Sequence, residues 1–214
     1  MLKKIFRSPV TTVALFVLAA GLLLTGTIGG VLAAPLIAAN RYYTAGLEVD
    51  TAPQLAIQEN GKTVDGNLLA DLTGDDTFLI GKSYDEGIAV VNTGGIDVYV
   101  RISIYRYWTD GDDKVVDLDP SYIGLEFEED GWTIDEDAST PERTVLYYAS
   151  PIAPGEATEL CISAITIDPK VASAKGEDGE FLYDGMTFNI MAVADGVQAH
   201  NSEEAMLSAW GRTN

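Results

Sequence analysis

The stretch that decides the fold reads Ile96-Asp-Val-Tyr-Val-Arg-Ile-Ser-Ile-Tyr-Arg-Tyr-Trp108. Aliphatic residues occupy every second position from Val98 to Ile104, and tyrosine, arginine or serine stands between them. Successive side chains of a strand point to opposite faces, so this alternation predicts a long strand with an aliphatic core face and an aromatic, polar outer face. The aromatic side chains expected on the outer face are Tyr99, Tyr105, Tyr107 and Trp108.

Further strand patterns lie on both sides of this stretch. They cover residues 45–49, 55–57, 87–91, 122–127, 131–134, 144–148, 159–167 and 186–197. Turn signals fall at Asn60-Gly61, Asn92-Thr-Gly-Gly95, Asp110-Gly-Asp-Asp113, Ala153-Pro-Gly155, residues 175–179 and Asp195-Gly196. The turn at residues 92–95 is expected to close a hairpin with the long strand. Roughly eight or nine short strands with regular turns predict an all-β, antiparallel β-sandwich.

Helix signals are few. Asp168-Pro169 predicts a short helical turn through Ala174, because proline suits the first helical position. Near the C-terminus, Asn201 is expected to cap a short helix, with Glu204 three residues later completing a capping box. That helix should run through Trp210 and end at Gly211.

The N-terminus has the pattern of a secretory signal peptide. Three basic residues within the first seven precede an uncharged segment, residues 10–39, whose first half is densely apolar. Small residues follow, so cleavage is expected after Ala33, and Ala34 then becomes the first mature residue. The alternative is a retained transmembrane anchor, since the uncharged segment is long enough to span a bilayer. The expected parts are a signal peptide (1–33), an N-terminal segment with the first strand (34–50), and a β-sandwich domain with a short C-terminal helix (51–214).

Composition excludes several classes of function. The chain has 214 residues, of which 13 are basic and 33 acidic, with one His and one Cys. A net charge of −20 excludes nucleic acid as a partner, because phosphates need a basic surface. One cysteine leaves no intramolecular disulfide, and Cys161, in an apolar strand pattern, is expected to be a small buried side chain. One histidine excludes sites that need two.

Candidate sites are weak. Five carboxylates after the long strand are the only candidate calcium ligands: Asp110, Asp112, Asp113, Asp117 and Asp119. Their spacing does not match an EF-hand loop, and a solvated hairpin tip explains them as well. No catalytic residue and no cofactor is expected, since there is no Gly-x-Ser-x-Gly motif. The aromatic outer face of the long strand either binds a glycan or another subunit, or packs beneath a neighbouring loop.

Four segments in this order carry a family resemblance. They are Gly29-Gly-Val-Leu-Ala-Ala34 leading into Tyr42-Tyr-Thr-Ala-Gly-Leu-Glu-Val49, the run from Gly81 to Arg101, Asp117-Leu-Asp-Pro120, and Phe188-Asn-Ile-Met-Ala-Val-Ala-Asp-Gly-Val-Gln-Ala-His200. The chain thereby resembles the TasA/camelysin family of exported Gram-positive proteins with W-type signal peptides. The resemblance implies a jelly-roll-like sandwich and a secreted subunit of biofilm-matrix or cell-surface fibres. It also implies self-association by donor-strand exchange, in which an N-terminal segment inserts as a strand into the next copy.

Residues 35–43 suit that donor role because they are apolar except for Arg41. The side chains expected to drive polymerisation are Leu36, Ile37, Tyr42 and Tyr43. Expected partners are other copies of the chain and the signal peptidase; a second matrix protein stays open. The membrane would be contacted only through an uncleaved N-terminus. The alternatives are an edge strand folded onto its own domain, a membrane-anchored surface binding domain, and a camelysin-like metalloprotease, which the lone His200 argues against.

Overall fold

The computed structural model describes residues 52–64, 68–70, 72 and 77–213, which all belong to the second of the two units of the chain, residues 37–214. The predicted signal peptide, the cleavage residues Ala33 and Ala34 and the donor segment lie outside the described residues, as do its side chains Leu36, Ile37, Tyr42 and Tyr43.

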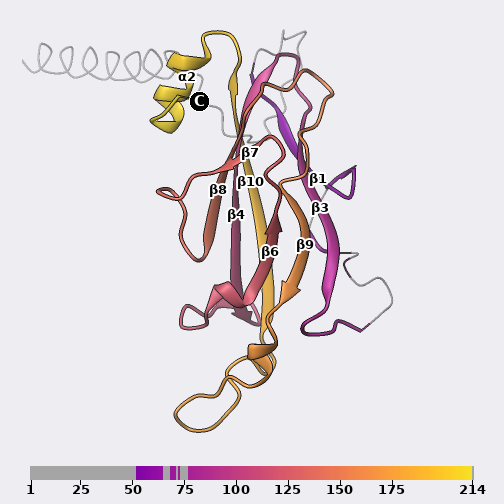
Figure 1. Ribbon diagram of the computed structural model, residues 1–214, viewed down its shortest axis with the longest axis vertical. Coiled ribbons are helices and arrows are strands. Elements are labelled where there is room, and N and C mark those ends of the chain that lie inside the picture. Colours follow the sequence, from indigo (N-terminus) through magenta and orange to yellow (C-terminus); the bar gives the residue numbers. More distant parts are fainter. Residues whose placement is uncertain (1–51, 65–67, 71, 73–76, 214) are drawn as a thin grey trace, which may run out of the picture. The chain divides into compact units, whose positions relative to one another are not determined.

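The described chain consists almost entirely of strands and loops (Figure 1). The strands are β1 (Leu55–Glu59), β2 (Lys62–Thr63), β3 (Ser83–Asn92), β4 (Val98–Asp110), β5 (Asp113–Lys114), β6 (Ile123–Phe127), β7 (Trp132–Ile134), β8 (Arg143–Tyr148), β9 (Ile162–Ile167) and β10 (Thr187–Gln198). The helical elements are two 3-10 turns, η2 (Pro120–Tyr122) and η3 (Pro169–Ala172), and the α-helix α2 (Ser202–Trp210).

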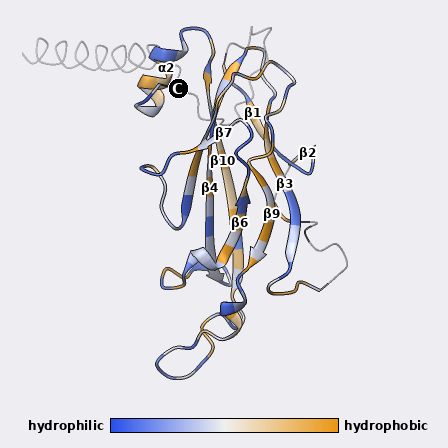
Figure 2. Cartoon of the chain, in the orientation of Figure 1, coloured by the Kyte–Doolittle hydropathy of each residue, from blue (hydrophilic) through white to orange (hydrophobic). Residues whose placement is uncertain are grey.

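These strands form two antiparallel sheets, which confirms the all-β prediction. One sheet has the order β2-β1-β3-β9-β6, and the other has the order β10-β4-β8-β7, with β5 also paired to β4. Buried side chains from both sheets belong to one hydrophobic core. Figure 2 shows the change along β3, which is hydrophilic at its start and hydrophobic from Ile88 to Val91, where it enters that core.

The long strand β4 follows its predicted alternation. Val98, Val100 and Ile102 are fully buried and Ile104 is 1% exposed, so they form the core face. The prediction that Trp108 lies on the outer face is wrong. Its side chain is only 4% exposed, and its Nε1 donates to the carbonyl of Asp119 at 3.0 Å. The period of two places residue 108 on the same face as residue 104, and the apolar ring is buried there.

The connection from β3 to β4 corrects a second prediction. The turn at residues 92–95 does not close a hairpin, because β3 and β4 belong to different sheets. Asn92 holds this corner. Its side-chain amide donates to the carbonyls of Ile96 (2.7 Å) and Ile152 (3.0 Å), and its Oδ1 accepts from the N–H of Gly94 at 3.0 Å. A buried amide thus satisfies the backbone groups of a chain that leaves one sheet for the other.

The predicted turn at Asp195-Gly196 is absent, because β10 runs straight through both residues. Asp195 forms an ion pair with Arg101 of the neighbouring strand at 2.8 Å. A Cβ at Gly196 would stand 3.0 Å from the side chain of Leu55 and 3.2 Å from that of Pro53. Glycine therefore serves a close approach between the two sheets here, and not a turn.

Helix α2 has the predicted limits, and Gly211 ends it in a left-handed conformation with φ 72°. The capping box is wrong: Asn201 is itself left-handed and its side chain makes no capping hydrogen bond. The helix is held by Met206, which is 2% exposed, and by Trp210, which packs on Tyr147 with ring centroids 5.3 Å apart and on the guanidinium of Arg101 at 5.6 Å. Among the described residues, no helix has the length and apolarity needed to cross a membrane.

Candidate assembly surface

The predicted calcium ligands follow β4 along the chain but do not come together as a site. Asp110 ends β4 and Asp113 begins β5, whereas Asp119 caps η2 by accepting from the N–H of Ser121 at 2.8 Å. The hydrogen bonds from the Ser121 side chain and backbone lower the pKa of Asp119. Within the described ranges, no three His, Cys, Asp or Glu side chains are grouped as metal ligands.

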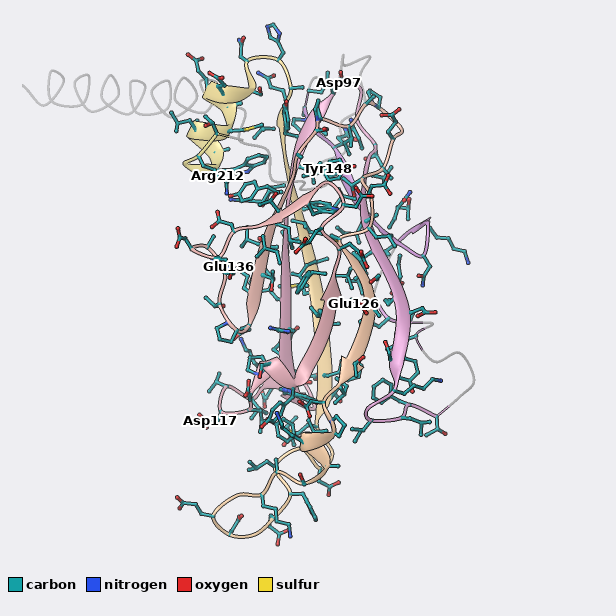
Figure 3. The ribbon with its side chains drawn as sticks, in the orientation of Figure 1. Asp97, Asp117, Glu126, Glu136, Tyr148 and Arg212 are labelled. Carbon is teal, nitrogen blue, oxygen red and sulfur yellow. The ribbon has the colours of Figure 1, made fainter. Side chains whose placement is uncertain are left out.

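Acidic side chains are instead spread over the described surface. The labelled carboxylates Asp97, Asp117, Glu126 and Glu136 extend from separate elements of both sheets and their loops (Figure 3). Such a distribution gives each copy a general negative field rather than one concentrated anionic site. His200, which follows β10, is exposed, and Cys161 is fully buried with its Sγ 3.2 Å from the carbonyl oxygen of Ile88.

Among the described strands, β10 is the longest one at an edge of its sheet. This strand of 12 residues pairs along its whole length with β4. Within the described part of the chain, β10 has no strand on its other side, and only β4 hydrogen-bonds to its backbone through backbone groups. A long edge strand of this kind is a template for a further strand.

The hydrogen-bond pattern shows which backbone groups lie along that edge. The N–H of Ala199 donates to the carbonyl of Asp97 at 2.9 Å, while Val98 exchanges both its backbone bonds with Ile152 on the opposite side of β4. In an antiparallel pair, the backbone N–H and C=O groups of successive residues point alternately toward the partner strand and away from it. Because Ala199 bonds toward β4, the odd-numbered residues of β10 do so as well. The backbone N–H and C=O groups of the even-numbered residues point to the open edge: Phe188, Ile190, Ala192, Ala194, Gly196 and Gln198.

Both faces of β10 are largely apolar beside this edge. Ile190 faces the core and is 9% exposed, whereas Met191 and Val193 on the outer face are 43% and 41% exposed. A strand that joined β10 would therefore find apolar neighbours on both faces as well as unpaired backbone groups. Exposed apolar side chains next to open hydrogen-bonding groups are typical of an interaction edge.

Strand β1 lies on the same side of the core. It pairs with β3 and, only at Gln58 and Glu59, with the short β2. Every residue of β1 is partly buried, and its Leu55 packs against Gly196 of β10. The edges of the two sheets thus approach each other where Leu55 of β1 packs against Gly196 of β10.

The family resemblance implied that a strand is added to the next copy, but the sequence did not identify the strands that would accept it. One signal was present, the uninterrupted run Ile190-Met-Ala-Val-Ala194, which is apolar on both faces of a strand. The donor residues themselves lie outside the described part of the chain, so their relation to this edge stays a prediction.

Comparisons of the chain with protein-family models, with curated proteins and with solved structures return no match.

Proposed function

We propose that this chain is an exported, non-enzymatic structural subunit that polymerises into cell-surface or extracellular-matrix fibres, as in a biofilm. In this proposal the signal helix of residues 1–33 is removed, the two sheets are connected as a jelly roll, and residues 35–43 of one copy add a strand to the next. The observation that carries the proposal is the open, 12-residue edge of β10.

The dimensions of donor and acceptor agree. Nine extended residues span roughly 30 Å and the edge of β10 about 40 Å, at about 3.3 Å per residue. The added strand would pair its backbone with the outward groups of β10 and bury Leu36, Ile37 and Tyr43. Burial of each large side chain contributes about 1.5–3 kcal/mol, which offsets the cost of ordering the segment.

The connectivity of such a contact determines the form of the assembly. The donor precedes β1, whereas the acceptor edge is β10, so each copy offers two different surfaces. A contact between different surfaces is head-to-tail, and it extends into a filament unless its rotation closes a ring. A fibre follows from the proposal without any further interface.

Deletion of residues 34–43 tests the donor. Filaments seen by negative-stain microscopy for the exported protein should be lost, while the deleted protein stays folded by circular dichroism. Filaments that persist after the deletion would sink the proposal. An intact N-terminus in the membrane fraction, without filaments, would support the anchored surface domain instead.

A proline at Ala192 tests the acceptor edge. Its N–H points away from β4, so Ala192→Pro removes a hydrogen bond to an added strand but none to β4. Polymerisation should fall strongly at nearly unchanged thermal stability. Ala192→Ser keeps the N–H at similar size and should polymerise normally; equal polymerisation by both variants would exclude this edge as the acceptor.

A further inference from the structure

An open groove of about 480 Å³ lies on the outer face of the sheet that contains β4, away from the core. Its chief lining residues come from distant parts of the chain: Tyr105, Tyr107, Lys114, Glu142, Asn189 and Met191. Helix α2 covers the other end of this face through Trp210, which packs on Tyr147 and Arg101. The groove end of the sheet has no such cover among the described residues.

Two tyrosine rings form the floor of the groove. Tyr105 and Tyr107 stand two residues apart on the same face of β4, which places them about 7 Å from each other along the strand. Both are partly exposed, and in the described part of the chain neither hydroxyl makes a hydrogen bond. They differ in this from the buried Trp108, whose indole N–H is paired.

Polar and apolar side chains stand on both sides of the floor. On β10, Asn189 and Met191 lie opposite Tyr107 and Tyr105, and Met191 is 43% exposed. On the other side Lys114 forms an ion pair with Glu142, and its ammonium lies 5.4 Å from the ring centroid of Tyr107. Aromatic faces, hydrogen-bond donors and acceptors are thus combined in one open trough.

We propose that this groove binds a neutral polysaccharide built of hexopyranose units. A pyranose ring has a C–H face that packs on the electron-rich face of an aromatic ring, and a rim of hydroxyls that both donate and accept hydrogen bonds. The tyrosine rings supply the stacking surface for successive sugars. The Nδ2 of Asn189 donates to Thr109 Oγ1 and to the carbonyl of Thr187, so its Oδ1 faces the ligand as an acceptor. This oxygen, the Glu142 carboxylate and the tyrosine hydroxyls supply partners for the rim.

The negative charge in and around the groove favours neutral saccharides over anionic ones. The one ammonium of the groove, on Lys114, is already paired with Glu142, and Asp112 adds a further carboxylate to the lining. With a chain charge of −20, polymers of uronic acids or sulfated sugars are repelled. The groove is open to solvent, which leaves room for an internal segment of a chain as well as a free end. This inference does not depend on fibre assembly.

Calorimetric titration of the full-length chain with cellohexaose, laminarihexaose and maltohexaose tests the proposal, in a detergent without a sugar head group. At least one of the three should bind saturably, and polygalacturonate should not bind. Tyr105→Ala and Tyr107→Ala should each weaken that binding about tenfold, the order expected for one stacked aromatic ring. Tyr107→Phe should restore most of it, because the ring remains.

Tyr99→Ala is the matched control, since Tyr99 lies on the same face of β4 but outside the groove. It should bind like the unchanged chain, and all variants should unfold at similar temperatures. The proposal is overturned if none of the three hexasaccharides binds, or if Tyr99→Ala weakens binding as much as the groove variants. It is also overturned if the groove variants change only polymer yield, because the groove is then a contact between copies.

Discussion

At the scale of single residues, two buried polar groups lie on or beside β3. Asn92, at the end of β3 where the chain changes sheet, is fully buried and bonded to three backbone groups. Cys161 is fully buried against Ile88 of the same strand. Water does not reach either buried side chain, so it cannot replace a hydrogen bond that a substitution removes. Their contributions should therefore be visible in stability measurements on single variants.

Asn92→Ala should lower the free energy of unfolding by about 2 kcal/mol, because the Ile96 carbonyl loses the Asn92 donor and the Gly94 N–H loses its side-chain acceptor. The Ile152 carbonyl loses one of two donors and keeps the N–H of Val98. Urea denaturation of the purified variant measures this loss. The adjacent, exposed Thr93→Ala is the control and should change stability by less than about 0.5 kcal/mol. Equal stability of the two variants would contradict the structural role of Asn92.

Cys161 should make stability fall at alkaline pH. Burial raises the pKa of its thiol to about 12, against an ordinary value of 9.0. A raised pKa in the folded state means that the contribution is fully present below pH about 9 and is lost as pH rises toward 12. Denaturation midpoints between these limits should drop more steeply for the unchanged chain than for Cys161→Ala, and parallel curves would refute the assignment.

At the scale of elements, α2 depends on the sheet beneath it. A helix of 9 residues is too short to be stable alone in water, so its packing must hold it. The side chains that do so are Met206, which is 2% exposed, Trp210 on Tyr147 and Arg101, and Arg212. The Arg212 guanidinium lies 4.4 Å from the Tyr147 ring and 3.1 Å from the carboxylate of Asp135. The helix is thus docked from its middle to its C-terminal end.

Trp210→Ala should release α2 without unfolding the sheets. We expect a loss of about 1–2 kcal/mol in overall stability, since one ring pair and one cation–π contact disappear. Amide exchange should accelerate from residue 202 to 210 and stay slow in β4. Leu207→Ala, on an exposed part of the same helix, should leave both measurements unchanged. Unaltered exchange in Trp210→Ala would show that other contacts dock the helix.

At the scale of the whole molecule, charge governs whether copies approach one another. Removal of residues 1–33 takes away three basic and no acidic residues, which leaves a net charge of −23. Repulsion of that size acts over about 30 Å at 0.01 M salt but over only about 8 Å at physiological ionic strength. The proposed association of this acidic chain with other copies should therefore depend strongly on salt.

Under the proposed function, polymerisation of the chain without residues 1–33, followed by light scattering and negative-stain microscopy, should accelerate as ionic strength rises from about 0.01 M to about 0.15 M. Calcium and sodium chloride at equal ionic strength separate screening from binding of a specific ion. If calcium acts only by screening charge and by weak bridging between carboxylates, polymerisation should be only modestly faster with calcium chloride than with sodium chloride. A fibre that forms only with calcium, at every ionic strength, would show instead that the carboxylates build a defined site.

Much of the fold could be read from local patterns. The period of two in residues 98–104 predicted both faces of β4, and most strands, η3 and the glycine stop after α2 lie where the sequence placed them. The same patterns could not show that β10 is an edge, or that residues 105, 114, 142 and 189 line one groove. Those facts depend on which strands pair, and pairing joins residues far apart in the chain.

The sequence by itself determined the all-β class, most strand positions, the core face of β4 from residue 98 to 104, and the strongly acidic charge. Only the tertiary structure decided that β3 and β4 belong to different sheets, that Asp195-Gly196 continues a strand, and that β10 lies open beside β1. The physical reason is that side-chain alternation is a property of neighbouring residues. Sheet order, by contrast, results from burying both apolar faces in one core.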